Sequence, residues 1–214
     1  MSRYHLQDTD SGLRLVDKFS FQHPLHINFS DAEFSYRLRR GGGKKEMIAK
    51  AVDAKMDLRV VDCTAGLGRD SFLLASLGCE VTLYERSPVM ALLLGDAIDR
   101  ALQTEVLSKI AGRLHLVHGD VLDAFASGFD KPDVILVDPM FPTRKKSAKV
   151  KGEMQFLQRF IGTDEDATRL LQSALATGCE RLVLKRPLLT NDIAGLKPSY
   201  SLKGKSSRFD VYLQ

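Results

Sequence analysis

The segment from Arg59 to Ser71, with the sequence RVVDCTAGLGRDS, restricts the fold of this chain more than any other. Its valines precede Asp62, as in a buried parallel strand that carries a polar residue at its carboxyl end. Gly66 and Gly68 follow, and glycine allows a sharp turn and a close approach of the backbone to a ligand. A helix after this loop would direct unpaired backbone N–H groups into the same space. This order predicts the first unit of a Rossmann-like nucleotide site, or otherwise a tight turn between core elements.

Three further apolar segments lead into acidic residues, and we predict each of them to be a strand of the same sheet. The pairs of segment and acid are 81–84 with Glu85, 114–118 with Asp120, and 134–137 with Asp138. Ligands of an open parallel sheet bind outside the carboxyl ends of its strands. The sequence therefore predicts that these acids gather with Asp62 along one edge of the sheet.

The positions of these residues favour a particular kind of cofactor. Glu85 follows the glycines by roughly twenty residues, a spacing at which a carboxylate accepts hydrogen bonds from ribose hydroxyls. Asp120 is placed either to face an adenine amino group or to cap the helix that follows. Ser71 stands where a dinucleotide fingerprint has its third glycine, which argues against a pyrophosphate cofactor. S-adenosylmethionine, a nucleoside with an amino-acid tail, fits these residues better.

The rest of the chain continues the alternation of helices and strands. Helical spacing and capping predict helices over 46–56, 72–77, 88–101 and 165–177, and apolar patterns predict strands over 181–185 and 208–213. The last strand is predicted to lie at a sheet edge. Together these elements predict an α/β fold.

The residues ahead of this unit show a period of two rather than 3.6. Apolar and polar residues alternate in 25–29 and again in 34–38, with a turn-like segment over 30–32. This pattern predicts a small antiparallel hairpin. A basic, glycine-rich joint over 39–45 follows it. We therefore predict two parts, an N-terminal appendage with the glycine joint over 1–43 and a main domain over 44–214.

The basic residues are clustered rather than evenly spread. Lys and Arg exceed Asp and Glu only by 31 to 27, but two segments are dense in positive charge. One holds Arg37, Arg39, Arg40, Lys44 and Lys45, and the other holds Arg144, Lys145, Lys146, Lys149 and Lys151. Such clusters favour polyanions, although a solvated face has the same composition.

Three cysteines, Cys63, Cys79 and Cys179, lie far apart in hydrophobic segments, without a C-x-x-C pair. This arrangement predicts buried thiols in a reducing compartment, and neither disulfides nor a metal site. The N-terminal residues lack the apolar core of a signal peptide, and no apolar run approaches the length of a membrane span. We therefore predict a soluble, cytoplasmic protein. Its 44% hydrophobic and 27% charged residues are ordinary values for a globular chain, which argues against disorder.

Two motifs resemble those of the class I S-adenosylmethionine-dependent methyltransferases. D-x-x-x-G-x-G runs from Asp62 to Gly68, and a D-P-x-F variant of the amine-methylating D-P-P-Y/F motif runs from Asp138 to Phe141. More specifically, the chain is similar to the RsmJ family, which methylates the guanine N2 of small-subunit (16S) ribosomal RNA. The blocks that carry this likeness are 62–70, 84–86, 137–154, 184–187 and 208–210. Members of that family have a longer extension before the glycine joint, which implies a truncated or divergent N-terminus here.

The resemblance implies a Rossmann-like fold with a mostly parallel seven-stranded sheet, helices on both faces and a small N-terminal β appendage. It implies S-adenosylmethionine as cofactor and small-subunit ribosomal RNA or the assembling 30S subunit as partner, with no membrane and no metal. The implied cofactor contacts are Asp62, Gly66, Gly68, Arg69, Asp70, Glu85, Arg86, Asp120, Val121 and Asp138. The implied RNA contacts are Arg39, Arg40, Arg144, Lys145, Lys146, Lys149 and Lys151.

The chemistry of such a reaction assigns the expected catalytic residues. A guanine amino group is a poor nucleophile because its lone pair is delocalised into the ring. The Asp138 carboxylate and the Pro139 carbonyl would accept hydrogen bonds from it and orient the lone pair. Phe141 would stack on a base that has left its helix or loop.

Other functions are compatible with the same residues. D-P-x-F motifs also serve methylation of adenine N6 or of protein glutamine. An RNA-binding module that retains the cofactor fold without turnover belongs to a different class. A nicotinamide dehydrogenase is a poorer alternative, because Ser71 replaces the third glycine.

Overall fold

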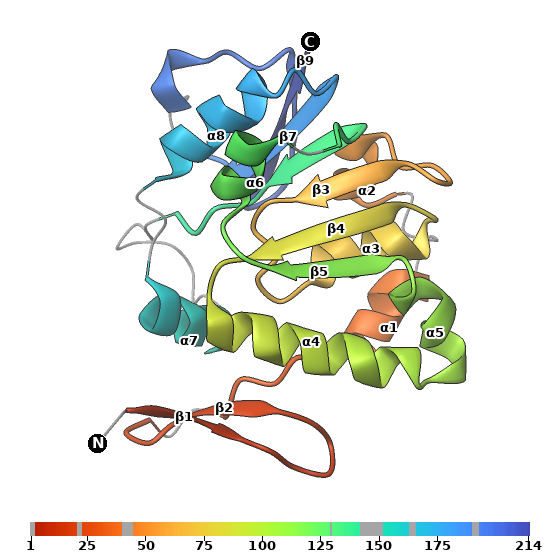
Figure 1. Cartoon of the computed structure of the whole chain (residues 1–214), viewed down its shortest axis with the longest axis vertical. Helices are drawn as coiled ribbons and strands as arrows, with labels where there is room; N and C mark the ends of the chain where they lie inside the picture. Colours follow the sequence, from red (N-terminus) through yellow and green to blue (C-terminus); the bar gives the residue numbers. More distant parts are fainter. Residues whose placement is uncertain are drawn as a thin grey trace.

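Helices cover both faces of a seven-stranded sheet in the computed structural model, and a two-stranded hairpin lies beside this body (Figure 1). The structure describes residues 3–20, 23–39, 45–128, 130–141, 152–162, 166–189 and 193–214. The sheet consists of β3 (Arg59–Asp62), β4 (Glu80–Glu85), β5 (Leu114–His118), β6 (Val134–Val137), β7 (Arg181–Pro187), β8 (Tyr200–Lys203) and β9 (Ser207–Leu213). This architecture confirms the predicted Rossmann-like α/β fold.

The strand order is β5-β4-β3-β6-β7-β9-β8. β3 pairs in parallel with β4 on one side and with β6 on the other. The chain therefore builds the sheet outward from β3 to β5 and then returns to the centre for β6. The order reverses between β3 and β6, which is where an open α/β sheet binds its ligand.

The far side of the sheet differs from the prediction in one strand. β9 runs antiparallel between β7 and β8, so its predicted place at the edge is wrong. The outer strand β8 was not predicted, because it is only four residues long and no residue in it is fully buried. Without a buried face, the apolar alternation that marks a strand is weak.

Neighbouring side chains of β3 enter two separate cores, because successive residues of a strand point to opposite faces. Val60 belongs to the larger core and Val61 to the smaller one. The larger core is covered by α1 (Ala32–Arg39), α2 (Met47–Val52), α3 (Arg69–Ser76), α4 (Pro88–Leu102), α5 (Glu105–Ala111) and α7 (Gly152–Ile161). The smaller core is covered by α6 (Val121–Ser127) and α8 (Ala167–Ala176), which lie together on one face in Figure 1. A short 3₁₀ helix spans Ile193–Gly195.

The hairpin predicted over 25–38 is wrong, and an antiparallel hairpin forms earlier in the chain. It pairs β1 (Tyr4–Gln7) with β2 (Arg14–Asp17). Residues 34–38 belong to α1 instead. Positions 34 and 38 lie on the same side in either a helix or a strand, so only the exposure of position 36 distinguishes the two structures. Tyr36 is 52% exposed whereas Phe34 is 5% exposed, which is a helical pattern and not an alternating one.

Aromatic contacts attach the N-terminal residues to the main body. The ring of Phe29 stacks on that of Phe72 in α3, with ring centroids 4.2 Å apart. The ring of Tyr4 in the hairpin contacts that of Phe160 in α7 edge-on, with ring centroids 4.9 Å apart. The predicted division at residue 43 falls within residues 40–44, which lie outside the described residues. The two-part organisation therefore stays a prediction.

Further features of the sequence find their structural counterparts. All three cysteines are free and buried, as predicted. The helix predicted over 46–56 ends earlier, at Val52, because Asp53 adopts a left-handed conformation with φ of 58°. Among the described residues, no helix combines the length and the apolar character that a membrane crossing requires.

Candidate active site

The loop between β3 and α3 turns tightly at its two glycines. Gly66 and Gly68 have φ angles of +53° and +67°, which are left-handed values that favour glycine. Gly68 also lies against the core, because a Cβ built there would be 2.6 Å from Cδ1 of Leu94. At Gly66 the nearest described atom to such a Cβ is the Thr64 carbonyl oxygen, 3.8 Å away. Gly68 therefore fits the loop onto the core, and Gly66 leaves backbone accessible above it.

The carboxylate of Glu85 holds this loop in place from the end of β4. Its Oε2 accepts a hydrogen bond from the backbone N–H of Gly66 at 3.0 Å, and its Oε1 accepts one from Ser87 N–H at 2.8 Å. Glu85 is only 7% exposed. The structure thus brings together two features that lie about twenty residues apart in the sequence.

Asp62 is buried under the same loop. Its Oδ1 accepts a hydrogen bond from Thr64 N–H at 3.0 Å, and its Oδ2 accepts one from the Ser71 hydroxyl at 2.5 Å. The residue that replaces the third glycine is therefore a structural partner of Asp62. Burial raises the pKa of Asp62 to about 6, and the nearby charges of Asp138 and Asp70 add to this while the two hydrogen bonds oppose it.

Replacing Asp62 by asparagine is expected to remove part of the pH dependence of stability. The folded-state pKa of about 6 lies above the ordinary value of 3.8. Between these values the folded protein binds more protons than the unfolded chain. The contribution of Asp62 to the free energy of unfolding therefore falls as the pH rises, by about 3 kcal/mol in total. Urea denaturation at about pH 4 and about pH 7.5 measures this. The free energy of unfolding of Asp62→Asn, relative to that of the wild type, should be higher at about pH 7.5 than at about pH 4. The same difference between the two proteins at both pH values would contradict this.

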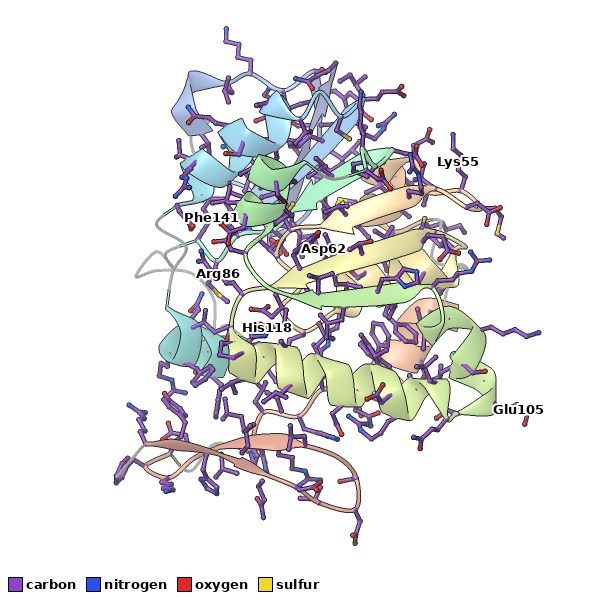
Figure 2. All side chains as sticks on the ribbon, viewed as in Figure 1. Lys55, Asp62, Arg86, Glu105, His118 and Phe141 are labelled. Atoms are coloured by element: carbon purple, nitrogen blue, oxygen red, sulfur yellow. The ribbon has the colours of Figure 1, made fainter. Side chains whose placement is uncertain are left out.

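The segment after β6 adjoins the glycine loop through Thr64, whose hydroxyl oxygen accepts a hydrogen bond from Asp138 N–H at 2.7 Å. Pro139 is buried, and Asp138 and Phe141 are half-buried. Met140 packs against the larger core and Phe141 against the smaller one. Figure 2 shows Phe141 and Arg86 on the side where the parallel strands end, whereas Lys55 and Glu105 lie on the opposite side.

Lys185 is a member of the site for which the sequence pattern gave no role. Its Nζ lies 2.8 Å from Oδ2 of Asp70 and 2.7 Å from Oδ2 of Asp138. Burial alone would lower the pKa of Lys185, but the two carboxylates raise it above its ordinary value. The available signal was the 184–187 block, since Lys185 follows the apolar part of β7 as the acids follow their own strands.

Other residues expected at the site have structural partners of their own. The guanidinium of Arg69 pairs with Glu153 of α7 at 2.9 Å, and that of Arg86 pairs with Asp166 before α8 at 2.8 Å. Asp120 caps α6, because its Oδ1 accepts a hydrogen bond from Leu122 N–H at 2.9 Å. Val121 is buried in the smaller core. The side chains of Arg69 and Arg86 thus extend from the loop ends toward α7 and α8.

The expected RNA contacts lie outside what the structure describes. These are the side chain of Arg39 and the residues Arg40, Arg144, Lys145, Lys146, Lys149 and Lys151. Within the described ranges, no group of three or more His, Cys, Asp or Glu residues is arranged to hold a metal ion.

The sheet order, the glycine loop at its reversal and the acids at the ends of its strands define a Rossmann-like fold of the nucleotide-binding type. The chain belongs to the family described as putative SAM-dependent methyltransferases, whose family model matches residues 1–214.

Named relatives agree with this membership. The chain is 46% identical over 213 residues to ribosomal RNA small subunit methyltransferase J of Ectopseudomonas mendocina (strain ymp), covering 98% of this chain and 82% of that protein. It is 48% identical over 192 residues to the protein of the same name from Pseudomonas aeruginosa (strain LESB58), covering 88% and 74%. A crystal structure of a SAM-dependent methyltransferase from Neisseria gonorrhoeae superimposes with a TM-score of 0.78 at 37% identity, covering 98% of this chain and 82% of that one.

Proposed function

We propose that this protein transfers a methyl group from S-adenosylmethionine to the exocyclic N2 of a guanosine in small-subunit ribosomal RNA, in the cytoplasm. The observation that supports the proposal is the hydrogen bond from Asp138 N–H to the Thr64 hydroxyl, which joins the D-P-x-F segment to the glycine loop. The likeness to relatives named ribosomal RNA small subunit methyltransferase J supports the choice of RNA.

The residues around the loop fit a nucleoside cofactor. Gly66 exposes backbone, and Glu85 offers carboxylate oxygens at the neighbouring strand end. Each carboxylate oxygen has two lone pairs, so Glu85 can accept from ribose hydroxyls while it holds the loop. Asp120 follows β5, one strand further along, and we assign its carboxylate to the adenine. Arg69, Asp70, Arg86 and Val121 complete the proposed set of cofactor contacts. When bound, S-adenosylmethionine supplies an electrophilic methyl group on a sulfonium.

The chain's own contribution is to present the guanine amine. The Asp138 carboxylate and the Pro139 carbonyl accept hydrogen bonds from the amino group, which favours a tetrahedral nitrogen with an oriented lone pair. Phe141, half-buried against the smaller core, provides a fixed ring for the splayed base. The lysines and arginines over 144–151 and at 39–40 hold RNA phosphates, so we expect binding to weaken with salt.

Methyl transfer to a defined RNA tests this proposal. Calorimetry should show binding of S-adenosylmethionine and no binding of NAD. Tritiated methyl groups should then enter small-subunit ribosomal RNA, either naked or assembled, and nucleoside analysis should yield N2-methylguanosine. A methylated adenine would overturn the choice of base. Cofactor binding without any transfer would leave an RNA-binding module instead of an enzyme.

Replacing Glu85 by glutamine is expected to weaken cofactor binding by about 10- to 100-fold. Hydrogen bonds to a charged acceptor contribute about 1.5–3 kcal/mol, and the amide NH₂ group cannot accept one from Gly66 or Ser87. The dissociation constant for S-adenosylmethionine from calorimetry measures the effect. Glu105→Gln is the matched control, because Glu105 is exposed at the start of α5 on the opposite side of the molecule (Figure 2). Equal affinities for the two variants would remove Glu85 from the cofactor site.

A further inference from the structure

Lys185 connects two acids that come from different parts of the chain. In the parallel pairing of β6 and β7, Val137 lies opposite Leu184, so the next residues, Asp138 and Lys185, are neighbours on one face of the sheet. Asp70 lies in the first turn of α3, which packs on that face of the sheet. The ammonium group of Lys185 is within 2.8 Å of one carboxylate oxygen on each acid.

We propose that Lys185 is a positioning residue for methyl transfer, which holds the Asp138 carboxylate ionised and in a fixed orientation by bridging it to Asp70. The proposal rests on the proposed function, since it concerns how Asp138 acts as the acceptor for the amino group of the substrate. It adds no chemical step and assigns Lys185 no contact with the reacting atoms.

Electrostatics explains why such a bridge is needed. Three carboxylates lie close enough here for their charges to interact: Asp62 at the end of β3, Asp70 in α3 and Asp138 after β6. The nearby cation Arg69 turns away to pair with Glu153. Carboxylates that share a site repel each other, so one of them takes up a proton more readily unless a cation lies between them. Lys185 is that cation, and the two carboxylates in turn keep it charged.

The protonation state of Asp138 decides what it can do for the substrate. An ionised carboxylate only accepts hydrogen bonds, whereas a protonated one carries an O–H donor that opposes the donors of the guanine amine. A flexible Asp138 would also lose the alignment on which transfer depends. Removing Lys185 should therefore slow the chemical step and shift its pH dependence, while substrates still bind.

Lys185→Met keeps an unbranched side chain, one atom shorter than lysine, and removes the charge. At saturating substrates we expect kcat to fall about 100-fold, comparable to the loss of one preorganised polar contact. The dissociation constant for S-adenosylmethionine and the KM for RNA should change less than about fivefold. The acidic limb of the kcat–pH profile should move to higher pH. Lys185→Arg, which keeps the charge, should recover at least about a tenth of the wild-type kcat.

Two further variants serve as a control and as an independent test of the role of Lys185. Lys55→Met removes an exposed lysine on the opposite side of the molecule (Figure 2) and should leave kcat and its profile unchanged. Asp70→Asn removes the competing carboxylate, so the acidic limb should move to lower pH, opposite to its shift in Lys185→Met. This opposite shift also serves as the test if Lys185→Met does not fold.

The outcomes separate this inference from the proposed function. A wild-type protein that fails to bind S-adenosylmethionine or to methylate RNA would overturn the proposed function. A Lys185→Met variant with wild-type kcat and pH profile, or one whose entire loss lies in cofactor affinity, would overturn the positioning role alone. The same holds if Asp70→Asn and Lys185→Met shift the acidic limb in the same direction.

Discussion

Asp138→Ala is expected to lower kcat for methyl transfer by about 10³-fold, the upper range for removal of one preorganised polar contact at a reacting centre. The substitution removes the carboxylate that accepts from the amine. It leaves in place the backbone N–H of Asp138, whose hydrogen bond to Thr64 fixes the motif against the glycine loop. Lys185 keeps Asp70 as a partner. The fold should therefore persist while the reaction is lost.

The measurement is the initial rate of tritiated methyl transfer to small-subunit ribosomal RNA, with thermal melting as the check on folding. Asp138→Asn retains one acceptor oxygen and should lose less activity than Asp138→Ala. Asp123→Ala, an exposed acid in the first turn of α6, is the matched control and should transfer at the wild-type rate. An unchanged rate in Asp138→Ala would remove this residue from the catalytic role.

Gly68→Ala is expected to lower the free energy of unfolding by about 4 kcal/mol. A left-handed backbone costs an L-residue about 1–2 kcal/mol, and inserting a methyl group into a packed core costs about 1–3 kcal/mol more. Both apply at Gly68, because its φ is +67° and a Cβ there would lie 2.6 Å from Leu94 and 3.2 Å from Phe29. Leu94 and Phe29 are both buried and have little room to move.

Gly178→Ala separates the two causes. Gly178 has nearly the same φ, +68°, but no described atom lies within 4 Å of a Cβ built there. It should therefore show only the backbone cost, about 1–2 kcal/mol. Urea denaturation followed by circular dichroism measures both variants. Equal destabilisation would mean that the Gly68 loop yields to the added methyl group, against the tight fit described above.

Much of the fold followed from patterns that are local in sequence. Four apolar segments, each followed by an acid, predicted β3 to β6. The central strands β3 and β6 are buried on both faces, which in a parallel sheet requires continuous hydrophobic residues. The antiparallel end of the sheet was harder to predict. β8 lacks a buried face, and β9 alternates as an edge strand would, although both its neighbours are present.

The N-terminal error has a similar origin. Phe34 and Leu38 satisfy both a period of two and a helical turn, so their spacing cannot distinguish the two structures. The contact between the rings of Phe34 and Phe72 favours the helix, because a helix buries Phe34 against Phe72 and leaves Tyr36 exposed to solvent. That contact joins residues 38 positions apart and has no local signature.

The site divides along the same line. The glycine loop, Glu85, Asp120 and Asp138 could be recognised from local patterns, since each is tied to the end of a strand that hydrophobicity reveals. The partners of these residues became apparent in the folded structure. The Ser71 hydroxyl donates a hydrogen bond to Asp62. Arg69 pairs with Glu153 and Arg86 pairs with Asp166. Lys185 joins Asp70 and Asp138, which are 115 and 47 positions away from it in the sequence. Hydrophobic periodicity encodes the elements one at a time, whereas charge pairing depends on the register and order of strands that come together only in the folded sheet.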